Sequence, residues 1–118
     1  MNSDCLFCRI ASGSIPSTKE YEDDDLVVFA DIHPVAPVHL LVIPRKHIAS
    51  VADLSADDTG LVGEMVMRAK EIAAKKGIAK DGYRLVFNVR DHGGQVIDHI
   101  HLHIIGGERL GPMAAAFR

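Results

Sequence analysis

HIHLHII, residues 99–105, places three histidines at every second position between large aliphatic residues. Successive side chains of a β-strand point to opposite faces, so this alternation predicts a strand with one imidazole face and one apolar face. The apolar face can be buried in a core, and the imidazole face then carries three groups that titrate near neutral pH. Packing alone explains such a row of His99, His101 and His103 poorly, and the row therefore indicates a chemical site.

The patterns around this row predict an α+β fold. Strands are predicted over five segments: 18–21, 26–30, 38–44, 83–89 and 98–105. The last two segments flank a glycine-containing turn at 91–95, which predicts an antiparallel pair. A short helix over 5–11 is expected to be capped by Asp4 and stopped by Gly13, and one long helix is expected between Ser55 and Gly77. This order of elements predicts an antiparallel sheet with a helix packed on one face.

Length and composition restrict the class of protein. The 118 residues are expected to form one domain, 1–118, with ordinary hydrophobic (47%) and charged (25%) contents. A net charge of −3 argues against nucleic acid as a partner, because non-specific binding needs a strongly basic surface. No apolar run reaches the length of a membrane span and the N-terminus lacks a signal-peptide pattern. A cytoplasmic protein that does not bind membranes is therefore expected.

A metal site is the main alternative interpretation of the histidine row, because imidazole binds zinc, copper, iron and nickel. Residues two apart on a strand are separated by roughly 6.6 Å, so His99 and His103 would start about 13 Å apart and could not easily share one ion. A linear row suits an extended anionic substrate better, since neutral imidazole forms covalent intermediates in group-transfer enzymes. The turn Gly93-Gly94-Gln95 and the nearby Asn88 can bring N–H donors to such an anion.

Several segments together resemble the histidine triad family, in its nucleotide-binding phosphoramidase branch. The matching segments are GGQ at 93–95, HIHLHII at 99–105, DIHP at 31–34, APVH at 36–39, LVIPRKH at 41–47, GYR at 82–84 and GG at 106–107. They extend over nearly the whole chain. The resemblance implies a five-stranded antiparallel sheet with one long helix and a short N-terminal helix, and a sheet that continues across a homodimer.

The resemblance also implies hydrolysis of purine nucleoside phosphoramidates and related nucleoside monophosphate conjugates. His101 would attack the α-phosphorus and form a nucleotidyl-histidine intermediate, which water then cleaves. His103 would contact the phosphate and help to protonate the leaving group, and His39 would lie beside the phosphate. The other implied nucleotide contacts are Asn88, Gly94, Gln95, Val96 and Ile97 at the phosphate, Asp31 at the ribose, and Phe7, Ile10, Phe29 and Ile32 at the base. The last four residues are equally compatible with an ordinary core.

Two other functions remain open. One is a nucleotide-binding regulatory or scaffold module whose activity is incidental, and the other is cleavage of dinucleoside polyphosphates or nucleotidyl transfer. His103 disfavours the transferase branch, which typically lacks this histidine, and the chain length disfavours the polyphosphate branch. Leaving-group preference is the least transferable property, because Val96 stands where many relatives carry a hydroxyl, Asp98 stands where an aromatic is frequent, and the tail lacks tryptophan.

Cys5 and Cys8 are the two cysteines of the chain, and their C-x-x-C spacing has three interpretations. A redox pair usually comes with a thioredoxin-like βαβ context, which the predicted order of elements lacks. The pair can also be two unpartnered thiols, or half of a tetrahedral zinc site completed by two distant histidines. His47 and His99 are the candidates for those ligands, and the resemblance favours this structural Zn²⁺ site.

Overall fold

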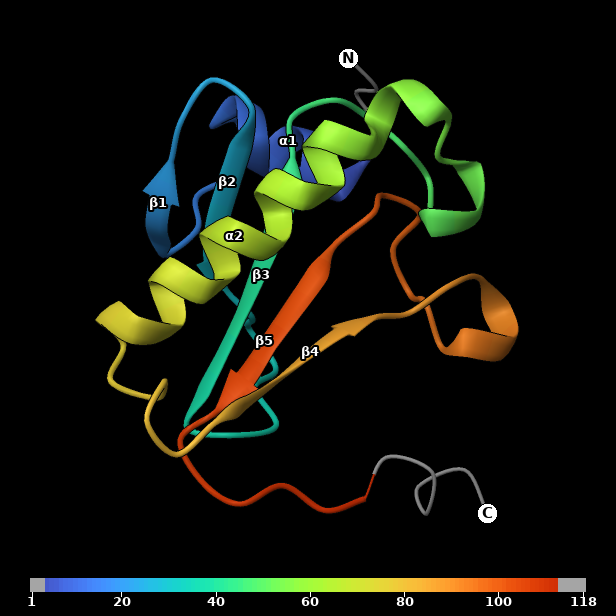
Figure 1. Ribbon diagram of the computed structural model, residues 1–118. Coiled ribbons are helices and arrows are strands. Elements are labelled where there is room, and N and C mark those ends of the chain that lie inside the picture. The colour runs from blue at the N-terminus through green and yellow to red at the C-terminus, as the bar shows by residue number, and fades with distance from the viewer. Residues whose placement is uncertain (1–3, 113–118) are drawn as a thin grey trace.

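Five strands form one antiparallel sheet in the computed structural model, which describes residues 4–112 (Figure 1). The strands are β1 (Lys19–Glu22), β2 (Leu26–Ala30), β3 (Val38–Pro44), β4 (Tyr83–Phe87) and β5 (Leu102–Gly106). Their spatial order is β1-β2-β3-β5-β4, so that β5 lies between β3 and β4. The α+β class, the antiparallel sheet and the predicted order of elements are confirmed.

Two α-helices, α1 (Leu6–Ser12) and α2 (Thr59–Lys75), flank the sheet. The short 3₁₀ helices are η1 (Val51–Asp53), η2 (Ala56–Asp58) and η3 (Asp91–Gly93). Gly13 and Gly77 follow the two α-helices with φ of +84° and +79°, as expected of glycines that stop helices. The expected cap at Asp4 is wrong, because Cys5 is the N-cap and its Sγ accepts a hydrogen bond from the Cys8 N–H. None of the helices in the described part of the chain is both long and apolar enough to cross a membrane.

The strands β2 and β3 supply side chains to two separate cores because their side chains alternate between the two faces. One core contains Leu26, Val28, Leu40 and Val42 and is covered by Met65, Ala69, Ile72 and Ala73 of α2. The other contains Val27, Phe29, Leu41 and Ile43 and is covered by Phe7, Cys8, Ile10 and Ala11 of α1. The two helices therefore cover opposite faces, with α2 lying across the front of the sheet in Figure 1.

Two strands are shorter than predicted. The register of β3 and β5 pairs Val42 with Leu102, and its extension would place Ile100 opposite Pro44. Proline has no N–H to donate to the ladder, so pairing stops there. The backbone N–H of Ile100 instead donates to the carbonyl of Ile48 at 2.7 Å. Hence β5 begins at Leu102 rather than residue 98, and β4, which pairs with it, ends at Phe87 rather than residue 89.

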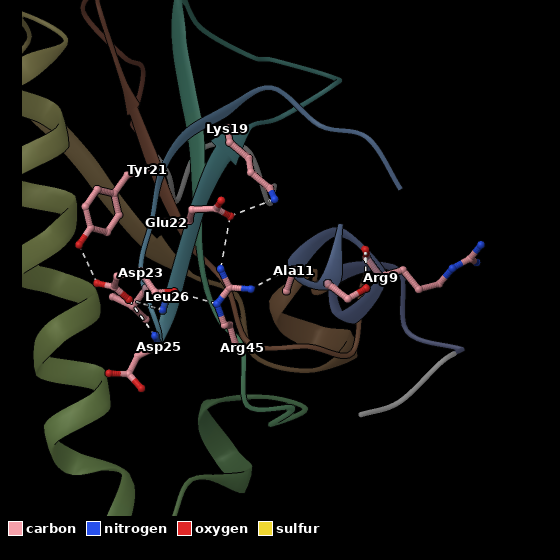
Figure 2. Close-up of polar contacts among 10 residues, drawn as sticks. Arg9, Ala11, Lys19, Tyr21, Glu22, Asp23, Asp25, Leu26 and Arg45 are labelled. Atoms are coloured by element: carbon pink, nitrogen blue, oxygen red, sulfur yellow. Dashed lines mark hydrogen bonds and ion pairs between the residues drawn. The ribbon is translucent and has the colours of Figure 1, made fainter. Parts of the chain in front are cut away.

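Arg45, the residue after β3, ties α1 to the sheet (Figure 2). Its Nη1 donates to the carbonyl of Ala11 at 2.5 Å, and its Nε donates to the carbonyl of Asp23 at 2.8 Å. Its Nη2 lies 3.3 Å from a carboxylate oxygen of Glu22. The Ala11 carbonyl belongs to the last turn of α1, where carbonyls lack intrahelical partners. One guanidinium thus fixes the cysteine-bearing helix against the β1–β2 connection.

Candidate functional site

The three histidines of the row do not form one continuous strand face. His103 lies in β5, whereas His99 and His101 precede it in a segment that is irregular because Pro44 ends the strand pairing. The rings of His101 and His103 remain neighbours, with centroids 5.0 Å apart. The ring of His99 instead lies with Cys5 and other sulfur and nitrogen donors. The prediction that all three rings lie on one face of a continuous strand is therefore wrong.

A backbone carbonyl fixes the tautomer of the His101 ring. Its Nδ1 lies 2.8 Å from the carbonyl oxygen of His99. A carbonyl can only accept, so Nδ1 carries the hydrogen and Nε2 keeps its lone pair when the ring is neutral. The ring is 7% exposed and packs edge-on against Phe7, with centroids 5.1 Å apart. Burial lowers the pKa of His101, which favours the neutral, nucleophilic form near pH 7.

A second set of polar groups lies beside His103. Its Nδ1 is 2.9 Å from Nε2 of His39, which in turn is 3.3 Å from a carboxylate oxygen of Asp31. Burial lowers the pKa of His39, while the Asp31 carboxylate opposes that shift. Burial, with the neighbouring rings of His101 and His39, lowers the pKa of His103 to about 4. Both imidazoles are therefore neutral at pH 7.

Asp31, His39 and His103 also place three ligand atoms within 4.8 Å of one another. The Nδ1 atom of His39 accepts a hydrogen bond from the backbone N–H of Val35 at 3.2 Å. A neutral His39 then carries its hydrogen on Nε2, the atom that would have to bind the ion. These three side chains are therefore better described as a hydrogen-bond network than as a metal site.

The glycine-containing segment after β4 is held by its own amides. Asn88 Nδ2 donates to the carbonyl of Gly93 at 2.8 Å. Gln95 Nε2 donates to the carbonyls of Ala49 and Ile97 at 2.7 and 2.9 Å, and its Oε1 accepts from the N–H of Arg90. Gln95 thus has both amide hydrogens bonded within the protein. Its direct contact with a phosphate stays a prediction.

The residues expected at the base divide into two groups. Phe7, Ile10 and Phe29 are 4–7% exposed and belong to the core under α1, although Phe7 also touches His101. Ile32, by contrast, is 83% exposed. Val96, expected at the phosphate, is also exposed, and Ile97 packs against the α1 core.

Cys5, Cys8, His47 and His99 come together as the sequence predicts, with their ligand atoms within 4.8 Å of one another. The Sγ of Cys5 is 3.3 Å from Nδ1 of His99, and the Sγ of Cys8 is 3.3 Å from Nδ1 of His47. The two Nδ1 atoms are 3.2 Å apart. Ligands around tetrahedral zinc are separated by about 3.3 Å for two nitrogens and about 3.6 Å for sulfur and nitrogen, given the usual bond lengths. The four side chains therefore fit a small tetrahedral metal ion.

The surroundings of the cluster support this fit. His99 is fully buried, and its Nε2 donates to the carbonyl of Pro44 at 2.8 Å, which leaves Nδ1 as the ligand atom. Burial raises the pKa of the Cys5 thiol, and a bound cation reverses this effect because it stabilises the thiolate. The cluster joins α1, the segment after β3 and the segment before β5.

Sequence patterns did not identify three contributors to the site. The carbonyls of His99 and Pro44 and the N–H of Val35 act through the backbone, and no side-chain pattern marks them. A separate cavity of about 430 Å³ lies at the other end of β5, near Ile78, Asp81 and Gly107. No histidine or cysteine lines this cavity, so the chemistry described above is not located there.

The profile of a family described as "Scavenger mRNA decapping enzyme C-term binding" matches residues 4–115. A "Purine nucleoside phosphoramidase" from Escherichia coli (strain K12) is 46% identical over 115 residues, which span 98% of this chain and 97% of that protein. The crystal structure of a "HIT family hydrolase from Legionella pneumophila Philadelphia 1" shares 50% identity with a TM-score of 0.89, covering 91% of this chain and 96% of that one. A "ZN-bound histidine triad family protein from Mycobacterium smegmatis" shares 31% identity with a TM-score of 0.76, covering 92% and 78%. These matches over nearly the whole chain show that the protein belongs to the histidine triad family.

Proposed function

We propose that this protein is a hydrolase of purine nucleoside phosphoramidates and related nucleoside monophosphate conjugates. The observation that carries the proposal is the state of His101, a neutral ring with Nδ1–H bonded to the His99 carbonyl and Nε2 bearing a lone pair. The 46% identical relative named purine nucleoside phosphoramidase supports the substrate class.

The reaction proceeds in two displacements at phosphorus. Nε2 of His101 attacks the α-phosphorus, the P–N bond breaks, and the nitrogen leaves as an amine that takes up a proton. Water then attacks the nucleotidyl-His101 adduct, and the P–N bond to the imidazole breaks. In sum, the water oxygen and one hydrogen end on the phosphate, and the other hydrogen ends on the amine.

The His99 carbonyl assists the first displacement. Attack by Nε2 makes the His101 ring cationic, and the hydrogen bond from Nδ1 to this carbonyl then becomes charge-assisted and stronger. Such stabilisation acts mainly where charge develops in the transition state. His103 lies next to His101 and contacts the phosphoryl group or the departing nitrogen.

We also propose that Cys5, Cys8, His47 and His99 hold a structural Zn²⁺ ion. The donor distances, the Pro44 bond to His99 and the Zn-bound relative from Mycobacterium smegmatis support this identity. When bound, the ion supplies a crosslink between α1 and the segment that leads into β5. The homodimer that the resemblance implies is a further proposal, with the edge strand β4 as the pairing strand.

Mapping of the covalent adduct tests the catalytic proposal. The protein is mixed with adenosine 5′-phosphoramidate, quenched within milliseconds in alkaline denaturant, digested and analysed by mass spectrometry. An adenylyl group on His101 is expected, and an otherwise identical His101→Asn sample should carry none. Steady hydrolysis with the adduct on another residue would contradict the assignment of His101.

A further inference from the structure

The imidazole of His39 has a backbone N–H on one side, and a carboxylate and a second imidazole on the other. The N–H of Val35 donates to Nδ1 at 3.2 Å. On the far side of the ring, Nε2 faces Nδ1 of His103 at 2.9 Å and a carboxylate oxygen of Asp31 at 3.3 Å. A peptide N–H cannot accept a hydrogen bond, and a carboxylate cannot donate one. The Val35 N–H and the Asp31 carboxylate therefore favour the same tautomer of His39, with the hydrogen on Nε2.

This tautomer determines the tautomer of His103. The hydrogen on Nε2 of His39 points toward Nδ1 of His103, so Nδ1 must accept and the hydrogen of His103 must be on Nε2. The opposite arrangement would set two N–H groups against each other at 2.9 Å, and would also set the Val35 N–H against a hydrogen on Nδ1 of His39. Burial keeps both rings neutral at pH 7, as a single tautomer requires.

The segment that presents the Val35 N–H is restrained. Pro34 and Pro37 each fix one backbone torsion. A carboxylate oxygen of Asp31 accepts from the N–H of His33 at 2.8 Å, which closes a turn at the start of the segment. Unlike a hydroxyl, a peptide N–H cannot rotate to become an acceptor. The backbone, together with the Asp31 carboxylate, therefore sets the direction of the hydrogen bonds in this network.

We propose that the backbone N–H of Val35 is a positioning group that places the hydrogen of His39, and through it the hydrogen of His103, on Nε2, so that His103 meets the substrate as a hydrogen-bond donor. The substrate part of this inference rests on the proposed function. Nε2 of His103 has no hydrogen-bond partner among the described residues, and the ring stands 5.0 Å from that of His101. A donor here can bond a phosphoryl oxygen or the lone pair of the departing nitrogen, whereas an acceptor would repel the phosphoryl oxygens.

The tautomers can be read directly by long-range ¹H–¹⁵N correlation spectra of the ¹⁵N-histidine-labelled protein at pH 7, without ligand. The signals of His39 and His103 are assigned by their loss in His39→Gln and His103→Gln. We expect a pyridine-like Nδ1 and a pyrrole-like Nε2 for both residues. A pyrrole-like Nδ1 in either residue would overturn the inference, whatever the activity of the protein.

Val35→Pro removes the donor, and Val35→Ala is the matched control because it shortens an exposed side chain and keeps the N–H. In Val35→Ala the His39 signals should stay as in the wild type. In Val35→Pro they should move toward a mixture of tautomers, and kcat should fall about tenfold below that of Val35→Ala, as for loss of one buried hydrogen bond. Unchanged tautomers in a folded Val35→Pro would overturn the role of Val35.

Should Val35→Pro fail to fold, the wild-type spectrum still tests the predicted tautomers of His39 and His103. The predicted tautomers in a protein without phosphoramidase activity would overturn the proposed function alone.

Discussion

The carbonyl oxygen of His99 accepts a hydrogen bond from Nδ1 of His101 at 2.8 Å, while the side chain of the same His99 lies in the cluster with Cys5 and Cys8. One residue therefore belongs, through its ring, to the cluster that fits a metal ion and, through its main chain, contacts the proposed nucleophile His101. Its ring is held from both sides, by the cluster at Nδ1 and by the Pro44 carbonyl at Nε2. The contacts of the ring therefore help to position the carbonyl that fixes the tautomer of His101.

Replacement of His101 by alanine should abolish turnover. The variant lacks the atom that is proposed to attack phosphorus, so kcat for adenosine 5′-phosphoramidate is expected to fall by at least about 10³-fold, as when a nucleophile is removed. Affinity for AMP, measured by calorimetry, should change little. His92→Ala, an exposed histidine in η3, is the control and should keep wild-type kcat. Turnover within tenfold of the wild type in His101→Ala would exclude a histidyl intermediate at this position.

Replacement of His47 by alanine should release the metal ion. The variant loses one of the four proposed ligands but leaves the His99 ring and its Pro44 bond in place. Metal analysis should give one zinc per wild-type chain and far less in His47→Ala. An ion present at a thousandfold excess over its dissociation constant stabilises the fold by about 4 kcal/mol, so Tm should fall as well. His33 is an exposed histidine outside the cluster, so His33→Ala should keep the zinc content and the Tm of the wild type. Purified wild-type protein with well under one metal ion per chain would contradict the site.

The backbone conformation of Arg90 predicts that glycine is tolerated better than alanine at this position. Its φ of 56° and ψ of −168° lie in a region that is nearly exclusive to glycine and costs other residues on the order of 1–3 kcal/mol. Arg90→Gly relieves that strain but loses the contact with Asp53, and Arg90→Ala loses the same contact while keeping the strain. Arg90→Gly should therefore be more stable than Arg90→Ala by about 1–2 kcal/mol in urea unfolding. At Val89, which has an ordinary φ, the glycine variant should instead be less stable than the alanine variant. Equal stabilities of Arg90→Gly and Arg90→Ala would show that the backbone relaxes without cost.

The features that the sequence predicts depend on side-chain type and spacing, whereas those that it misses depend on strand register and on backbone atoms. Alternation over 26–29 and 40–43 determines which side chains enter which core, and side-chain type and spacing suggest Cys5, Cys8, His47 and His99 as ligands. The strand prediction over 98–101 failed because Pro44, on a neighbouring strand, has no N–H to pair with. That effect depends on a register that only the folded sheet defines. The tautomers of His39 and His101 depend on backbone atoms, which every residue carries, so side-chain patterns could not reveal them.

Asp58 gives a pH-dependent prediction at the start of α2. A hydrogen bond from Lys46 at 2.7 Å, and then one from the backbone N–H of Ser55 at 2.9 Å, lower the pKa of Asp58 below its usual value of 3.8. The folded state thus favours the carboxylate, and the resulting stability is present above pH 3.8 and is lost as the pH falls through the lower, folded pKa. The free energy of unfolding of the wild type should exceed that of Asp58→Asn at pH 7, and the difference should shrink below about pH 4. Asp57→Asn, at the exposed neighbouring position, should follow the wild type throughout. Parallel wild-type and Asp58→Asn curves of urea-unfolding free energy from pH 7 to pH 3 would exclude the capping contribution of this carboxylate.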